Sequence, residues 1–187
     1  MPRFESHILE PAAGLKSKQV GLFLWQLDDQ TRWLTEDTGG ATPEELGWQL
    51  APGMNTIGML LAHIAVVEVS WIRRGLFEID DLGDGVLPIG RRETGMPLPA
   101  GAAPPTALDG KDLAFFDDLL ARSRDQTRRE LAALDDVDLD RRSRHRPRPD
   151  TEMELSIGWM LYHLVEHEAG HYYQINLLRH AYRCGNK

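Results

Sequence analysis

The sequence has little of what would place the protein outside the cell or in a membrane. Its single cysteine, Cys184, cannot form an internal disulfide, so packing must stabilise the fold, and we expect a reducing compartment. No apolar run approaches the roughly 18 residues that indicate a membrane span. The N-terminal segment MPRFESHILEPAAGLKSKQV lacks the apolar core of a signal peptide. These absences predict a cytoplasmic protein with no membrane partner.

A surplus of basic residues is missing as well. The chain has 29 acidic and 21 basic residues and a formal net charge of -8. This balance disfavours nucleic acid as a partner, because non-specific affinity for it comes mostly from neutralised phosphates. The exception is residues 141–148, RRSRHRPR. We interpret them as a solvated loop, and the alternative is an anion-binding lip over a pocket, formed by Arg142, Arg144 and Arg146.

What the sequence does have is long helical periodicity. With 187 residues, 42% of them hydrophobic, it is long enough for one domain spanning residues 1–187. We expect Asn55 and Ser156 to be helix N-caps, and Gly39 and Gly75 to end helices. There is no convincing strand. The spacing of apolar residues predicts four long helices, over residues 16–37, 56–74, 109–134 and 156–183.

The longest stretch without helical period is residues 79–107, which is rich in glycine, proline and aspartate. A segment of this length is too long for a simple connection between neighbouring helices. Some four-helix bundles need one long crossover of this kind. We therefore predict an all-α fold, a four-helix bundle with a long crossover loop.

The last predicted helix carries a stripe of histidines. His163, His167 and His171 are spaced four residues apart, so they follow one side of the helix, with about 6 Å of rise between neighbours. Two imidazoles at positions i and i+4 can bind one metal ion. The outer two histidines are about 12 Å apart along the axis, too far to share an ion. The spacing leaves two candidate pairs, 163/167 and 167/171.

A third ligand is expected from another helix, because bundle cores are where such sites are built. His63 lies in the apolar middle of the second predicted helix. An unpartnered polar side chain there would cost about 1–3 kcal/mol, and a metal ion is one good partner. The alternatives are a core hydrogen bond for His63 and a partly exposed polar face for the histidine stripe. Three imidazoles suit zinc best, and nickel or iron also accept nitrogen ligands.

The segments NTIGMLLAHIAVVEVSW and YHLVEHEAGHYYQINLLR resemble the DinB/YfiT-like family of metal-binding four-helix bundles. The resemblance implies that His63, His167 and His171 bind a divalent metal ion, and that His163 is an upstream histidine outside the ligand set. Gln174 follows the pair as in the family. Tyr173 stands where the family often has glycine, which implies a bulkier pocket.

The resemblance also implies a function. Related proteins are S-transferases and isomerases that use low-molecular-weight thiols, and some are amidases or hydrolases. We therefore expect a metal-dependent enzyme, a homodimer, that transfers or conjugates a low-molecular-weight thiol to a small-molecule substrate. The arginines of residues 141–148 would then bind carboxylates of the thiol. The alternatives are a metal-dependent hydrolase or amidase, and a non-catalytic metal-binding stress protein.

Several neighbours of the histidines are candidates for supporting roles. Glu166 is one residue from His167, and adjacent helical positions point about 100° apart, so an outer orienting contact fits it better than a ligand role. His163 and Gln174 are candidates for the same outer contacts. Tyr173 is expected to pack or to line the pocket.

Overall fold

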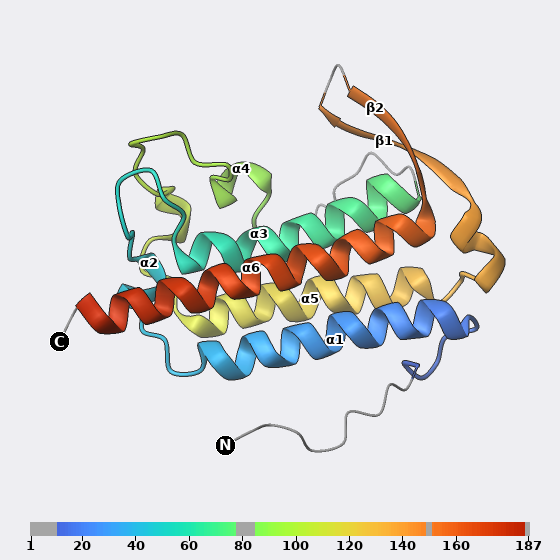
Figure 1. Ribbon diagram of the computed structural model, residues 1–187, viewed down its shortest axis with the longest axis horizontal. Helices are drawn as coiled ribbons and strands as arrows, with labels where there is room; N and C mark the ends of the chain where they lie inside the picture. The colour runs from blue at the N-terminus through green and yellow to red at the C-terminus, as the bar shows by residue number, and fades with distance from the viewer. Residues whose placement is uncertain (1–10, 78–84, 149–150, 186–187) are drawn as a thin grey trace.

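Four long helices form the body of the protein: α1 (Lys18–Thr38), α3 (Ile57–Ser70), α5 (Leu113–Leu131) and α6 (Ile157–Gly185) (Figure 1). The computed structural model describes residues 11–77, 85–148 and 151–185, with the backbone alone at 145–148 and 151–152. Helices α1 and α6 run in one direction and α3 and α5 in the other. The four-helix bundle predicted from the sequence is confirmed.

Because α3 and α5 are parallel, the chain between them must return along the bundle, which confirms the predicted crossover (Figure 1). It contains the short helix α4 (Arg91–Thr94) and the 3-10 turn η2 (Thr106–Leu108). Residues 79–84 of the predicted segment lie outside the described residues. Helix α4 packs against α3, so the crossover covers one end of the bundle.

Helix α3 is buried along most of its length, which fits its almost entirely apolar sequence. Its N-cap is Thr56, whose side-chain oxygen accepts a hydrogen bond from the Met59 backbone N–H at 3.1 Å. The predicted cap, Asn55, was wrong by one residue. The prediction that Gly75 ends this helix was also wrong, because the chain continues as a π-helical turn, η1 (Trp71–Leu76).

Other helix ends agree with the sequence patterns. Gly39 is the C-cap of α1. The Ser156 hydroxyl accepts a hydrogen bond from the Trp159 backbone N–H at 3.2 Å and so caps α6. Helix α5 begins later than predicted, because its N-cap is Asp112. A short helix, α2 (Pro43–Gly47), joins α1 to α3.

The interior has two apolar clusters separated by a polar layer. One cluster contains Leu60, Phe116 and Ile175, and the other contains Leu27, Leu131 and Leu161. Buried charged residues lie between the two clusters along the helices, at the positions Glu68, Arg124 and Glu168. The middle of the bundle is therefore where polar chemistry is concentrated.

The prediction that residues 141–148 form a loop was wrong, as was the prediction of no strand. Strands β1 (Arg142–Arg148) and β2 (Thr151–Ser156) form an antiparallel hairpin that follows the 3-10 turn η3 (Asp136–Asp140). Ser143 is buried while Arg142 and Arg144 are exposed. The side chains alternate in burial, but the buried position holds serine instead of an apolar residue, so the hydrophobic pattern of a strand is absent.

Within the ranges that the structure describes, no helix combines the length and the apolar character needed to cross a membrane.

Candidate metal centre

Three histidines from two helices meet at the middle of the bundle. His167 Nε2 lies 3.2 Å from His63 Nε2 and 3.1 Å from His171 Nε2. One nitrogen from each of the three residues lies within 4.8 Å of the other two. The structure thus brings His63 together with the pair 167/171, the pair that the family resemblance implied.

The nitrogen positions fit a metal ion. Zinc binds imidazole nitrogens at about 2.0–2.1 Å, which places two nitrogens of a tetrahedral site about 3.3 Å apart. The distances of 3.2 and 3.1 Å around His167 are close to this value. An ion among the three nitrogens would accept all three lone pairs at once, whereas each hydrogen bond between two of them needs a proton on one nitrogen.

The electrostatics of the group keep the imidazoles neutral. Burial lowers the pKa of His63 to about 4, and the positive forms of His171 and Arg91 contribute. Burial and the neighbouring histidines lower the pKa of His167 to about 2. Burial also lowers the pKa of His171, although its hydrogen bond with Gln174 opposes the shift. At neutral pH each imidazole therefore has a lone pair available for a metal ion.

Gln174 orients one member of the group. Its Oε1 lies 2.9 Å from His171 Nδ1. A proton on Nδ1 can be donated to this oxygen, and that tautomer leaves the lone pair on Nε2, facing the other histidines. His63 differs, because its buried Nδ1 has no hydrogen-bond partner among the described residues. Its orientation depends on packing within α3.

His163 stands beside the group and does not join it. Its ring stacks on Trp159, with ring centroids 5.1 Å apart and planes at 6°, and its centroid is 4.7 Å from that of Trp71. Its Nδ1 lies 3.3 Å from a Glu166 carboxylate oxygen. The centroids of His163 and His167 are 5.9 Å apart. The rings of Trp71, Trp159 and His163 together form an aromatic wall next to the candidate metal centre. Glu166 contacts this wall through His163.

The remaining predicted site residues lie elsewhere. Tyr173 is 71% exposed and its ring contacts Tyr172, so the structure does not bring it to the centre. Arg142 forms an ion pair with Glu154 at 3.1 Å on the outside of the hairpin. Arg144 is exposed, and the Arg146 side chain is outside the described residues.

A buried charge network next to the centre was not predicted from the sequence. Arg124 Nε lies 2.8 Å from a Glu68 carboxylate oxygen, and one terminal nitrogen lies 3.0 Å from Glu168. The other terminal nitrogen reaches Asp28 at 3.0 Å. The side chains of Glu68 and Glu168 are only 4% and 2% exposed. Glu168 directly follows His167, so this network anchors the turn of α6 that carries the central ligand.

The charge balance of this network is reflected in its pKa shifts. Burial raises the pKa of Glu168 to about 7, with Arg124 opposing and Glu68 adding to the shift. Burial alone would lower the pKa of Arg124, but the nearby carboxylates raise it overall. Thr31 accepts a hydrogen bond from Arg124 and donates one to Glu168. Arg124 is thus held as a cation by groups from three other helices.

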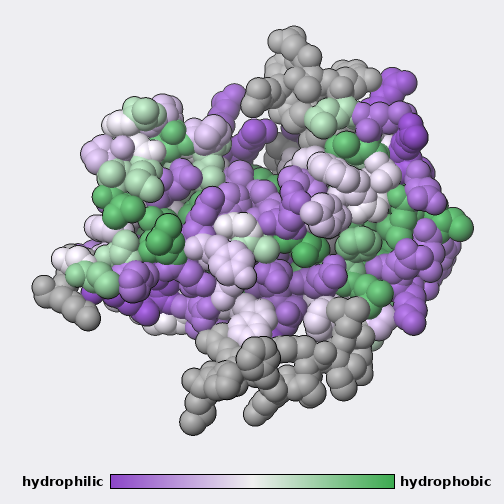
Figure 2. Space-filling view, viewed as in Figure 1, coloured by the Kyte–Doolittle hydropathy of each residue, from purple (hydrophilic) through white to green (hydrophobic). Residues whose placement is uncertain are grey.

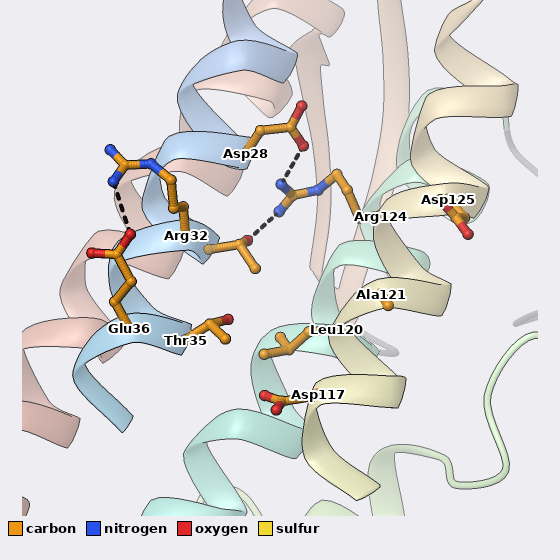
Figure 3. Close-up of a pocket in the computed structure, with 10 residues that line it drawn as sticks. Asp28, Arg32, Thr35, Glu36, Asp117, Leu120, Ala121, Arg124 and Asp125 are labelled. Atoms are coloured by element: carbon orange, nitrogen blue, oxygen red, sulfur yellow. Dashed lines mark hydrogen bonds and ion pairs between the residues drawn. The ribbon is translucent and has the colours of Figure 1, made fainter. Parts of the chain in front are cut away.

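An open pocket of about 530 Å³ lies between α1 and α5 (Figure 3). Leu120 and Ala121 line it, and the Arg124–Asp28 ion pair forms part of its wall. None of its lining residues belongs to the histidine group. Asp28, Thr31 and Arg124 of the buried charge network form part of the pocket wall, so the pocket borders that network.

The lowered pKa values predict that the metal-free protein loses stability in acid. A histidine with a pKa near 6.5 when unfolded and near 4 or 2 when folded takes up its proton more readily in the unfolded state. The contribution of His63 and His167 is complete above pH 6.5 and is lost as the pH falls toward those folded values. Glu168 acts in the opposite direction, since its raised pKa favours the folded state at lower pH.

The measurement is the urea midpoint of the chelator-treated protein at pH 7.5 and at pH 5.0. Replacing His63 by glutamine should reduce the difference between the two midpoints. An unchanged difference in this variant would contradict the assignment of the acid sensitivity to the histidine group.

The fold and the site define a class of protein: a four-helix bundle in which two helices present a three-histidine group that could hold a metal ion. The comparison with protein families agrees, since the sequence profile of the DinB superfamily matches residues 26–175. The chain belongs to the DinB superfamily. A comparison with curated protein sequences gives no match.

Proposed function

We propose that the protein is a metal-dependent enzyme that transfers or conjugates a low-molecular-weight thiol at the centre formed by His63, His167 and His171. The observation that supports this most is the half-buried, three-membered donor set. Among the described residues, the group offers three neutral imidazoles and no fourth protein ligand. Catalytic zinc sites keep an open position in this way, whereas structural sites are closed by a fourth protein ligand.

The residues of the chain would hold and orient the ion. The Nε2 atoms of His63, His167 and His171 would bind it, and Gln174 would keep the His171 ring in the required tautomer. A bound divalent ion supplies Lewis acidity, which lowers the pKa of a thiol and so favours the nucleophilic thiolate. Zinc is the first candidate because it suits imidazole ligands, followed by nickel and iron.

The surroundings of the centre support an anionic thiol and an acceptor with an apolar surface. Arg91 lies close enough to His63 for its positive charge to lower the pKa of that imidazole. Arg91 would attract a carboxylate of the thiol. The wall of Trp71, His163 and Trp159 would contact the acceptor, since flat aromatic rings bind apolar groups well. We place this activity in the cytoplasm, where thiols stay reduced.

The test is a conjugation assay with zinc-loaded and chelator-treated protein. Cysteine, glutathione and coenzyme A are each offered with an aryl chloride whose conjugation changes its absorbance. In the reaction the thiol loses its proton to solvent, a sulfur–carbon bond forms, the carbon–chlorine bond breaks and chloride leaves. We expect turnover with at least one thiol, dependence on zinc, and loss of turnover in His167→Ala.

His163→Ala serves as the matched control, because this histidine lies on the same helix one step before the ligand pair. It should keep zinc and retain zinc-dependent turnover, with a raised KM for the acceptor because the aromatic wall loses one ring. Turnover that persists without zinc, or equally in His167→Ala, would reject the proposed mechanism. Zinc-dependent hydrolysis of amides or esters without thiol conjugation would favour a hydrolase. Tight zinc binding that raises the melting temperature, with no turnover of any substrate, would favour a non-catalytic metal-binding protein.

A further inference from the structure

The pocket between α1 and α5 differs from the rest of the bundle surface. Purple, hydrophilic residues predominate where α1 and α6 face the viewer in Figure 2, as is usual for surface helices. The wall of the pocket is mostly apolar, although charged residues surround it. Leu120 and Ala121 of α5 contribute to this wall, and Thr35 of α1 points toward α5 from the opposite side (Figure 3). A small molecule with an apolar body could therefore lie between the two helices.

The charges around this pocket do not balance. Two arginines and four acidic residues line it. Both arginines already have acidic partners in the pocket wall. Arg32 pairs with Glu36 at 3.1 Å, and Arg124 pairs with Asp28 at 3.0 Å. Two negative charges are therefore left over.

Asp117 and Asp125 of α5 carry these two charges. Neither side chain forms a hydrogen bond or an ion pair with another residue in the described part of the chain. Asp117 points toward α1 in Figure 3 and is partly buried. Burial raises the pKa of Asp117, and no neighbouring charge contributes to the shift. Its ionised carboxylate thus lacks a counter-charge, which a cationic ligand would supply.

The spacing of the two carboxylates indicates the kind of cation. Asp117 and Asp125 are eight residues apart, about 12 Å along the helix axis, with Ala121 midway between them. One small ion cannot contact both. Among the described residues, the histidine group is the one whose three ligand atoms lie within 4.8 Å of one another, so the acids of the pocket do not converge on a metal ion. An extended molecule with a positive charge at each end and an apolar middle fits better.

We propose that this pocket binds an aliphatic polyamine, with one ammonium group at Asp117, another at Asp125, and the carbon chain across Ala121. Nine bonds join the terminal nitrogens of spermidine, which makes about 10–11 Å at the 3.3–3.6 Å that an extended chain spans in three bonds. Five bonds in butane-1,4-diamine span only about 6 Å, so the diamine reaches one acid and not both. The Thr35 hydroxyl is available to accept a further hydrogen bond from the first ammonium group. Because the histidine group takes no part, this inference does not depend on the proposed enzymatic function.

The test is titration calorimetry of the full chain with spermidine at pH 7.5 and physiological salt. The protein is treated with chelator first, so that an amine cannot bind through a metal ion. We expect one saturable site per chain with a dissociation constant below about 1 mM. Butane-1,4-diamine should bind at least about threefold more weakly, because it loses one of the two ion pairs.

Variants of the two acids locate the ligand. Asp117→Asn should weaken spermidine binding by about tenfold, because this carboxylate is partly buried. Asp125→Asn should weaken it by about threefold, because Asp125 is exposed, and should leave the diamine unaffected. The matched control is Asp118→Asn, which makes the same charge change on the same helix. Asp118 pairs with Arg122 and does not line the pocket, so the control should change the affinity by less than about twofold.

A further variant fills the pocket and leaves both acids in place. Ala121→Lys puts an ammonium group between them and should abolish spermidine binding, while lysine keeps the helix propensity of this exposed position. An unchanged far-ultraviolet circular dichroism spectrum checks that each variant is folded. Absence of saturable binding to the wild-type protein overturns the proposal. Equal affinities for spermidine and the diamine, or equal losses in Asp117→Asn and Asp118→Asn, overturn it as well, since they indicate attraction to the net negative charge of the chain alone.

Discussion

Arg124→Met is expected to lower the free energy of unfolding by about 3–5 kcal/mol at neutral pH, the usual cost of removing one partner of a buried ion pair. The variant leaves the Glu68 and Glu168 carboxylates buried without their common cation. Methionine fills a similar volume, so the loss reports the charge and not a cavity. The measurement is urea denaturation followed by far-ultraviolet circular dichroism.

Two comparisons separate this effect from a general loss of arginine. Arg122→Met removes an exposed pair with Asp118, whose side chains are about half exposed, and should change the stability by no more than about 0.5 kcal/mol. The loss in Arg124→Met should also shrink as the pH falls, because protonation neutralises the stranded carboxylates. Similar losses for both variants, or a loss that grows in acid, would contradict the assigned role of Arg124.

The parts of the fold that are encoded locally could be predicted from the sequence. The apolar run of α3 and the serine that caps α6 are properties of short segments, and the structure agrees with them. The position of His63 could be predicted for the same reason, since a histidine within an apolar helix must face the interior. Spacing alone left two histidine pairs open, because the choice depends on where α3 meets α6.

The buried charge network depends on that same meeting of helices, and so it was missed. A signal was nevertheless present in α5. The apolar stripe Leu120, Thr127 and Leu131 has a gap at the intervening position, and Arg124 occupies it. A charged residue on a buried stripe predicts a buried partner. Helical spacing places Glu168 in the same way between Leu164 and Ile175 on the buried side of α6.

The hairpin shows the limit of reading patterns along the chain. Pairing between β1 and β2 satisfies the backbone groups of a segment whose side chains are mostly charged. Strand prediction relies on alternating apolar residues, and an exposed two-stranded hairpin does not need them. The arginine-rich composition favoured a solvated loop. The side chains Arg142 and Arg144 are indeed exposed to solvent, but the backbone that carries them is paired in the hairpin.

His167→Ala is expected to cause the largest loss of metal affinity of any substitution in the protein. His167 Nε2 lies within about hydrogen-bond distance of both other ligand nitrogens, at 3.2 and 3.1 Å. Removing the His167 imidazole leaves only two ligands, His63 and His171, and takes away the nitrogen that lies close to both of them. Zinc affinity, measured by competition with a chromophoric chelator on untagged protein, should fall by more than about 100-fold, beyond the 10–100-fold loss typical of an outer-contact mutation.

A graded series makes this result specific to the assigned ligands. Gln174→Leu removes only the hydrogen bond to His171 Nδ1 and should weaken zinc binding by about 10–100-fold. His163→Ala removes an imidazole of the aromatic wall and should leave zinc affinity unchanged. A loss in His163→Ala equal to that in His167→Ala would show that the ion lies one helical turn nearer the N-terminus of α6, between residues 163 and 167. The ligand set would then differ from the one that the nitrogen distances favour, because His171 would stand outside it.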